Sequence, residues 1–215
     1  MTDSSASEIH NPYLMFLGDA ADQLAAKTAD GVAKWRPDWC VGQMRLPGCN
    51  ADLGLPDMTI AEAKVAGVQT VVLGVANRGG VIGDAWMEKL EDALASGMDI
   101  ASGLHTKLAG IPRLNEAAQK HGQRLIEVRH PRREFSVASG VRRTGKRLLT
   151  GGTDCSVGKM FTSLAIEKEM LSRGVKADFR ATGQTGIFIA GDGVSVDAVV
   201  ADFISGATEW LTPDN

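Results

Sequence analysis

The sequence predicts an α/β protein: a parallel sheet with helices on both faces, followed by a second α/β domain built around a phosphate-binding loop. Short apolar runs alternate with segments of helical periodicity along most of the 215 residues, which is typical of parallel sheets. The 25 glycines and the aromatic content of only 5% favour many glycine turns over a β-sandwich. A glycine-framed loop that ends in Gly158-Lys159 marks the second domain.

Apolar or alternating runs mark the strands of the first domain, and apolar residues at helical spacing mark its helices. Gly97 and Gly122 stop two of these helices. Residues 1–12 are expected to form a disordered tail, and the domain is expected to occupy 13–130. The expected elements are strand 13–18, helix 20–29 continued by 32–35, strand 40–44, helix 60–66, strand 68–76, helix 84–96, strand 98–104, helix 113–121 and strand 124–128.

A linker rich in Arg and Ser, residues 131–145, is expected to separate this domain from a P-loop-like domain at 146–215. The expected elements of that domain are a strand at 148–150, a helix at 160–173 closed by Gly174, an alternating strand at 175–179 and a helix at 196–205. Only 36 residues follow Phe179, so we expect the second sheet to be incomplete at its C-terminus. A further chain segment or a partner chain is expected to complete it.

The loop in front of the 160–173 helix has the composition of a phosphate cradle. Backbone N–H groups of a glycine-rich turn, the positive end of a helix and the charge of Lys159 can converge on one anion. The alternative is that the glycines only make a tight turn. The expected cofactor-binding residues are Gly152, Thr153, Asp154, Cys155, Ser156, Val157, Gly158, Lys159 and Met160.

Two departures from the usual phosphate loop bear on its ligand. Five residues separate Gly152 from Gly158, one more than usual. Met160 stands where the usual loop has the Ser or Thr that binds Mg²⁺. We therefore expect a phosphate-bearing ligand that needs no metal, such as coenzyme A, and we expect no metal site.

Two polar segments follow expected strands, where open α/β sheets bind their ligands. Residues 77–80 follow the strand at 68–76, and Arg78 can hold a substrate carboxylate through two hydrogen bonds, although a plain glycine turn fits as well. Residues 182–185 follow the strand after the cradle and supply hydroxyl and amide groups. The expected substrate-binding residues are Asn77, Arg78, Gly79, Gly80, Thr182, Gln184 and Thr185.

The sequence pattern leaves the catalytic base open. Asp192 lies in a glycine loop and His105 follows an expected strand, and these two residues are the candidates. Alternatively, Ser195 caps a helix, and Asp192 and Asp197 are structural. A nucleophilic role for Cys155, inside the cradle, is a further alternative.

Charge and composition limit the expected partners. The net charge of −3 gives no reason to expect nucleic-acid binding, and the basic cluster at 129–147 indicates a solvated linker, a polyanion site or a contact to cofactor phosphates. We see no apolar run of the ~18 residues that a membrane span needs. The start of the chain does not have the pattern of a signal peptide. A cytoplasmic homo-oligomer with a small-molecule substrate is expected, with no membrane partner.

The loop Gly152-Thr153-Asp154-Cys155-Ser156-Val157-Gly158-Lys159 resembles the cradle of dethiobiotin synthetase. Over nearly the whole chain, the sequence is similar to a two-domain family long catalogued as of unknown function. That resemblance rests on the same loop and on Asn77-Arg78-Gly79-Gly80, residues 182–186 and residues 191–193. It implies a Rossmann-like N-terminal half, a P-loop C-terminal half and a chain that continues beyond Asn215. It also implies activity as a D-glutamate N-acetyltransferase.

The expected function is therefore transfer of an acetyl group from acetyl-CoA to the amine of D-glutamate or a similar acidic D-amino acid, in D-amino-acid catabolism. Arg78 is expected to hold the substrate carboxylate, and Asp192 or His105 is expected to take the ammonium proton. Two alternatives stay open. One is an ATP- and Mg²⁺-dependent ligase or kinase of the dethiobiotin-synthetase type, which Met160 disfavours. The other is a nucleotide-sensing module without catalysis.

Overall fold

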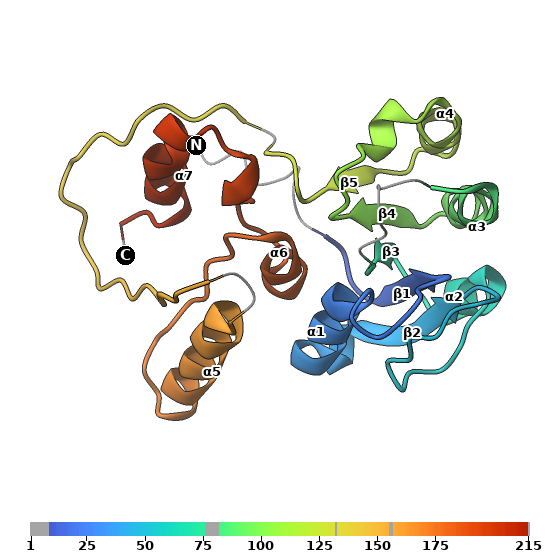
Figure 1. Cartoon of the computed structure of the whole chain (residues 1–215), viewed down its shortest axis with the longest axis horizontal. Coiled ribbons are helices and arrows are strands. Elements are labelled where there is room, and N and C mark those ends of the chain that lie inside the picture. The colour runs from blue at the N-terminus through green and yellow to red at the C-terminus, as the bar shows by residue number, and fades with distance from the viewer. Residues whose placement is uncertain (1–8, 76–81, 132, 155–156, 215) are drawn as a thin grey trace.

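A parallel five-stranded sheet forms the centre of the N-terminal half (Figure 1). The computed structural model describes residues 9–75, 82–131, 133–154 and 157–214. Each pair of neighbouring strands runs parallel, so the predicted α/β class is confirmed. The strands are β1 (Tyr13–Gly18), β2 (Cys40–Arg45), β3 (Thr70–Leu73), β4 (Asp99–Ser102) and β5 (Leu125–Glu127).

The strand order β2-β1-β3-β4-β5 fixes where a ligand can enter this half. The chain leaves β1 toward β2 and later returns to β3 on the other side of β1, so the order reverses between β1 and β3. At such a switch point, the loops after the two strands diverge to opposite faces and leave a crevice at the carboxyl ends. The loops concerned begin at Asp19 and at Gly74.

Helices cover both faces of this sheet. Figure 1 shows α2, α3 and α4 on one side and α1 on the other. Local sequence signals set several of their ends: Thr59 and Glu62 form a capping box at the start of α2, and Gly122 ends α4 in the left-handed conformation. The bounds are α1 (Lys27–Trp35), α2 (Ile60–Val65), α3 (Asp84–Ala95) and α4 (Pro112–His121), with single turns at Pro37–Trp39 and Leu108–Gly110.

The C-terminal half contributes directly to the core of the N-terminal half. Its helices are α5 (Lys159–Ser172), α6 (Gln184–Ala190) and α7 (Ile204–Leu211), with single turns at Val196–Ala198 and Ala201–Phe203. α6 packs against α1, and its side chains Ile187, Phe188 and Ile189 are buried in the same apolar cluster as the sheet. A second, small cluster under α7 joins Val194, Ala207 and Leu211.

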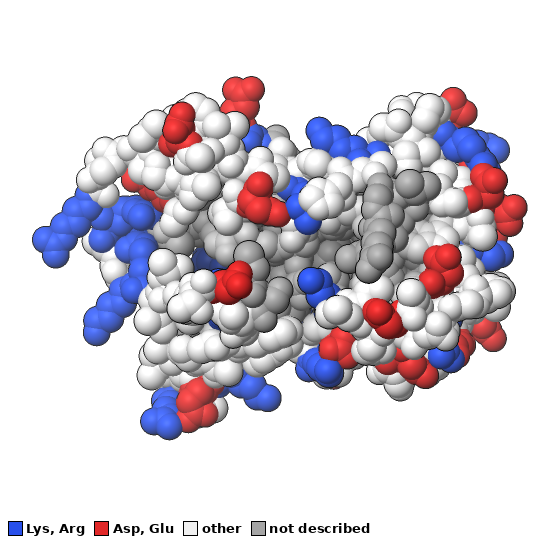
Figure 2. Space-filling model, in the orientation of Figure 1, with Lys and Arg blue, Asp and Glu red and all other residues white. Residues whose placement is uncertain are grey.

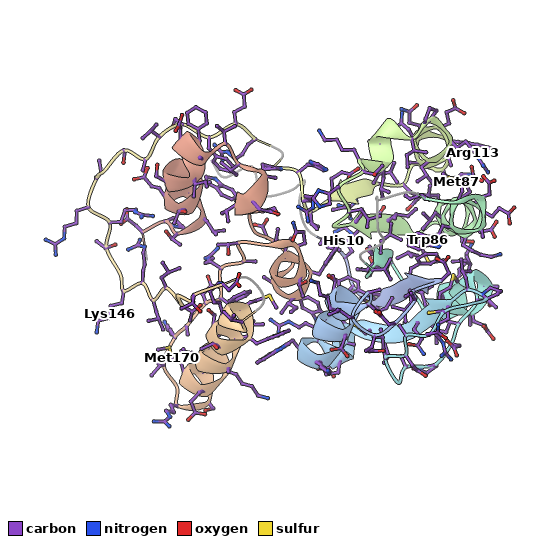
Figure 3. All side chains as sticks on the ribbon, in the orientation of Figure 1. His10, Trp86, Met87, Arg113, Lys146 and Met170 are labelled. Atoms are coloured by element: carbon purple, nitrogen blue, oxygen red, sulfur yellow. The ribbon has the colours of Figure 1, made fainter. Side chains whose placement is uncertain are left out.

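The chain between β5 and the cradle wraps around α7. Arg143 Nη1 donates to the carbonyl oxygen of Glu209 and to Thr212 Oγ1, each at 2.8 Å, and Arg147 Nη2 donates to the carbonyl oxygen of Pro213 at 2.8 Å. Cations are favourable at this carbonyl end of a helix. Arg143 and Arg147 are therefore held by carbonyl groups at the end of α7 and just beyond it, which argues against their predicted option of contacting cofactor phosphates. Lys146 points away from the molecule (Figure 3).

Lys and Arg side chains gather at one edge of the face shown in Figure 2, over the 133–150 segment, while acidic and basic groups are mixed elsewhere. None of the helices in the described ranges is long and apolar enough to cross a membrane.

The predicted elements of the first half are present, and several of them have other ends than predicted. β3 and β4 cover less than predicted, and α1 begins at Lys27 rather than at residue 20. A turn in which Asp22 Oδ1 accepts the N–H of Ala25 at 2.8 Å occupies the preceding residues, which explains the late start of α1. The predicted helix at 160–173 is confirmed as α5, with Gly174 at φ +73° beyond its end.

Two strands predicted in the second half are wrong. Residues 148–150 and 175–179 contain no strand, and Leu149 is 91% exposed and Val175 50% exposed. A strand needs a neighbour for its backbone hydrogen bonds, and neither segment pairs with another strand within the described ranges. The helix predicted at 196–205 is also wrong, because two single turns fill this stretch and α7 starts only at Ile204.

Candidate functional site

In the predicted phosphate cradle, the side chain of Lys159 is hydrogen-bonded to the backbone of the loop itself. α5 begins at Lys159, and Gly158 before it has φ +95°, a left-handed conformation that favours glycine. The ammonium of Lys159 donates to the backbone carbonyl of Asp154. Gly152 leaves room for this arrangement, because a Cβ there would lie 3.0 Å from Lys159 Cγ and Cδ. The lysine thus lies across the loop, at the place where the sequence predicts an anion.

The other predicted cradle residues are exposed or outside the described part of the chain. Gly152, Thr153, Asp154 and Val157 are open to solvent, so a ligand can reach the loop. Cys155 and Ser156 lie outside the described residues.

Met160 turns away from the cradle. Its Sδ would lie 3.4 Å from a Cβ at Gly186, and its side chain packs against the core. Only the backbone of Met160 therefore remains on the cradle side. The next hydroxyls along α5 are engaged with the helix itself: Thr162 Oγ1 donates to the carbonyl of Gly158 at 3.0 Å, and Ser163 Oγ donates to that of Lys159 at 3.2 Å.

The described residues contain no group of three or more His, Cys, Asp or Glu side chains that could hold a metal ion.

Of the substrate residues predicted at 182–185, Gln184 and Thr185 lie at the start of α6 and contact the N-terminal half, while Thr182 precedes the helix and is exposed. Thr185 Oγ1 lies 3.2 Å from Thr28 Oγ1, in the first turn of α1. Gln184 passes close over Gly103, just beyond β4, where an added Cβ would lie 3.0 Å from Gln184 Cβ. The second half therefore places a hydroxyl and an amide at the carboxyl edge of the sheet in the first half.

A polar network holds the amide of Gln184. Its Nε2 lies 3.0 Å from Ser195 Oγ and 3.2 Å from Asp197 Oδ2, and Ser195 Oγ donates to Asp197 Oδ1 at 2.6 Å. Arg129 Nη1, just beyond β5, donates to Asp197 Oδ2 at 2.7 Å, and its Nε donates to the carbonyl oxygen of Gly103 at 3.1 Å. The network therefore connects the start of α6 with the ends of β4 and β5.

Asp197 is held as a carboxylate in this network. Partial burial raises its pKa, but hydrogen bonds from Ser195 and Gln184 and the charge of Arg129 outweigh that effect, so the pKa lies below its ordinary value. Ser195 itself is 1% exposed. The network is thus ionised, with Ser195 buried at its inner end and the carboxylate of Asp197 half exposed.

The two candidates for the catalytic base lie in exposed loops. Asp192 follows the C-terminal end of α6, about 10 Å of helix from Gln184 at the usual rise per residue, and its Oδ1 accepts the N–H of Gly193 at 2.8 Å. His105 lies beyond β4, and its backbone carbonyl accepts from His130 Nε2 at 3.2 Å. The structure brings His105 to the same edge of the sheet as Gln184, and it places Asp192 at the far end of α6.

The predicted carboxylate site, Asn77, Arg78, Gly79 and Gly80, lies outside the described residues. Its N-terminal flank is described: the carbonyl of Gly74 accepts the N–H of Ala29 at 3.0 Å. The loop therefore begins beside α1, at the switch point between β1 and β3.

Sequence reasoning missed Thr28 and the connection of Gln184 to Ser195 and Asp197. Ser195 was expected to cap a helix, but its hydroxyl makes no capping hydrogen bond and donates to Asp197 instead. Thr28 lies in the first turn of α1, so the strand order could have indicated it. Arg129 was read only as part of a basic cluster, because its partner Asp197 is 68 residues away in sequence.

Fold and site together define a two-part α/β protein: a Rossmann-like sheet whose carboxyl edge meets a phosphate-loop half. Family models match residues 44–131 as the Rossmann-like domain and residues 136–215 as the P-loop domain of DUF1611, a domain of unknown function. The chain belongs to this family, which confirms the resemblance found in the sequence.

Relatives with a named activity and a solved structure of the same family are also similar to this chain. The chain is 58% identical over 207 residues to a D-glutamate N-acetyltransferase of Tritonibacter scottomollicae and 50% identical over 207 residues to one of a Pseudoalteromonas species. Each match covers 96% of this chain, which spans 62% of the length of these relatives. The crystal structure of a DUF1611 family protein from Anabaena variabilis matches with a TM-score of 0.77 and 34% identity, over 94% of this chain and 62% of that one.

Proposed function

We propose that this chain is the acetyl-CoA- and substrate-binding part of an N-acetyltransferase that acts on D-glutamate or a similar acidic D-amino acid in D-amino-acid catabolism. The names of the two curated relatives support this activity. The structural observation that carries it is the junction: the helix behind the cradle contacts α6 through Met160 and Gly186, and α6 contacts α1 through Thr185 and Thr28. This junction supports the proposal, because it connects the predicted cofactor loop with the predicted substrate residues.

The cradle would hold the phosphates of acetyl-CoA. Lys159 supplies one positive charge to them, and N–H groups of the loop and of the first turn of α5 supply hydrogen bonds. Met160 contributes no oxygen, in keeping with phosphates that are bound without Mg²⁺.

The reaction joins the substrate nitrogen to the acetyl carbon. The ammonium loses a proton to a base, the free amine attacks the thioester carbonyl, and the new C–N bond replaces the C–S bond as coenzyme A leaves with a free thiol. The reaction needs a base for the ammonium proton and donors that stabilise the oxyanion. Arg78 for the substrate carboxylate, with Asn77, Gly79 and Gly80, and His105 or Asp192 for the base remain our candidates.

A thiol-release assay tests the proposal. Protein, acetyl-CoA and D-glutamate are mixed, and free thiol is followed with and without a chelator. We expect release with D-glutamate at a rate that the chelator leaves unchanged. L-glutamate, D-aspartate and D-glutamine, run in parallel, define the substrate. Absence of thiol release with every acidic amino acid of either hand would overturn the proposal.

Calorimetry distinguishes the proposed acetyltransferase from the alternative of an ATP- and Mg²⁺-dependent ligase or kinase. We expect coenzyme A to bind without metal. Tight binding of ATP only with Mg²⁺, together with no binding of coenzyme A, would favour a ligase or kinase instead.

The proposal also covers partners and location. We place the enzyme in the cytoplasm as a homo-oligomer, with small molecules rather than nucleic acid as its ligands. The free thiols of Cys40 and Cys49 are in keeping with a reducing compartment.

A further inference from the structure

The side-chain amide of Gln184 can be oriented in only one way. Asp197 is an acceptor, so the group that faces it must be the NH₂ of the amide and not its oxygen. Of the two hydrogens on Nε2, one points to Ser195 Oγ at 3.0 Å and the other to the carboxylate of Asp197 at 3.2–3.3 Å. Both donors of Gln184 are therefore used inside the protein.

The oxygen of the same amide remains available. Within the described ranges, the hydrogen bonds of the Gln184 side chain all use Nε2 and leave Oε1 without a partner, and the residue is only partly buried. The stem of Gln184 rests over Gly103, which fixes the side chain beyond the end of β4. The network thus fixes which end of the amide is free, and it presents the carbonyl oxygen of Gln184 as an acceptor at the junction of the two halves.

The chemistry of the substrate selects what this acceptor can bind. An acidic amino acid carries two carboxylates, which only accept hydrogen bonds at neutral pH, and one ammonium, which only donates them. A carbonyl oxygen therefore has one complementary group on that substrate.

We propose that Gln184 Oε1 accepts a hydrogen bond from the substrate nitrogen that is acetylated, and that Asp197, Ser195 and Arg129 are positioning residues that hold the amide for this contact. This inference rests on the proposed function and adds to it a specificity-determining residue. Thr185 and Thr28 stand beside Gln184 in the same junction.

The test compares two ligands that differ only in the ammonium group. D-Glutamate and glutarate carry the same two carboxylates, and glutarate lacks the nitrogen. Calorimetric dissociation constants are measured for both ligands on the full chain and on Gln184→Leu, which keeps the bulk of the side chain and removes the acceptor. We expect Gln184→Leu to raise the dissociation constant of D-glutamate by about 10- to 100-fold, the range for a hydrogen bond to a charged group. The dissociation constant of glutarate should stay unchanged.

Asp197→Asn tests the positioning role. The new amide can donate to Gln184 Oε1, so Gln184 can turn over and present its NH₂ to the ligand. We expect Asp197→Asn, like Gln184→Leu, to lower the affinity for D-glutamate and not that for glutarate. The KM for the amino acid should rise, and the KM for acetyl-CoA should stay unchanged. Gln119→Leu is the matched control, at an exposed position on α4 across the sheet. It is expected to change the affinity for neither ligand.

Each result decides one question. If Gln184→Leu weakens D-glutamate and glutarate equally, or raises the KM for acetyl-CoA instead, the inference is wrong while the proposed function stands. If the unaltered protein transfers no acetyl group to any acidic amino acid, the proposed function fails first. Because both ligands are measured on the same variant, a loss of folded protein lowers both signals together and does not imitate a selective effect.

Discussion

The indole of Trp35 and the ring of Phe161 are stacked, with their centroids 6.2 Å apart and their planes 10° from parallel. Trp35 is the last residue of α1, and Phe161 lies in the first turn of α5, two residues after Lys159. Of the residues of α5, only Leu164 is buried. The stack therefore supplies much of what fixes the cradle helix against the N-terminal half.

Removing this stack should loosen the cradle. We expect Phe161→Ala to lower the free energy of unfolding by about 1–3 kcal/mol, because a half-exposed ring and an aromatic pair are both lost. The affinity for coenzyme A should fall as well, since the helix that carries Lys159 is less well placed. Urea unfolding and calorimetry measure the two effects. Leu171→Ala, at a 53% exposed position of the same helix, should do less on both counts, and equal losses would show that the stack has no special part.

The charge of Lys159 should decide binding at the cradle. We expect Lys159→Ala to raise the dissociation constant for coenzyme A by about 10- to 100-fold, the range for hydrogen bonds to charged groups. Lys168→Ala removes the same charge from an exposed position further along α5 and should leave the affinity nearly unchanged. Unaltered binding by the Lys159 variant would mean that the loop is only a turn.

Two neighbouring glycines of the cradle should respond differently to alanine. A Cβ at Gly152 would lie 2.8 Å from Val157 Cγ2 and 3.0 Å from Lys159 Cγ, whereas a Cβ at Gly151 would meet nothing within 4 Å. We expect Gly152→Ala to displace Lys159 and weaken coenzyme A binding, and Gly151→Ala to bind like the unaltered protein. Titration calorimetry on both variants checks this. The reverse order of effects would contradict the position of Lys159 described above.

Close packing at the switch point should make Gly74 intolerant of any side chain. A Cβ there would lie 2.3 Å from Ala29 Cβ and 3.0 Å from its Cα, so the start of α1 would have to move. We expect Gly74→Ala to cost about 1–3 kcal/mol of unfolding free energy, as overpacking does. Gly110→Ala, whose nearest neighbour would be Lys107 Cβ at 3.9 Å, is the control and should be nearly neutral. Equal melting temperatures for the two variants would rule out this contact.

Acid should remove the contribution of Asp197 to stability. The pKa of Asp197 lies below its ordinary value in the folded protein, so its stabilising effect is full above the pKa of the unfolded chain, about 3.9, and is lost as the pH falls through the folded value. Its side chain is 52% exposed, which limits the effect to about 1 kcal/mol or less. We expect the unfolding free energies of the unaltered protein and Asp197→Asn to differ most near pH 7 and to converge below pH 4. A difference that is constant with pH would show that the charge of Asp197 does not matter.

Local patterns predicted the N-terminal half well because each signal there is contained in a few neighbouring residues. Thr59 and Glu62 begin α2, Gly122 ends α4, and the apolar run at 13–18 is buried as β1. The strands expected at 148–150 and 175–179 depended instead on sheet neighbours, which no local pattern supplies.

The candidate site divides in the same way. Gly158 and Lys159 at the start of α5 could be predicted, because a phosphate loop and the helix after it are adjacent in sequence. The contact of Thr28 with Thr185 joins residues 157 apart, and only the packing of α6 on α1 brings them together. The direction of the Met160 side chain likewise depends on Gly186 in another helix.

The burial of α6 against the N-terminal half constrains the two halves to evolve together. The apolar layer on the α1 side of the sheet is completed by Ile187, Phe188 and Ile189. If the Rossmann-like half were cut off before the cradle, it would expose an apolar surface to water. Exchanging the P-loop half for that of a distant relative would require a new fit against α1 as well as a new ligand loop. Recombination between such proteins is therefore constrained at α6, a helix outside the phosphate loop.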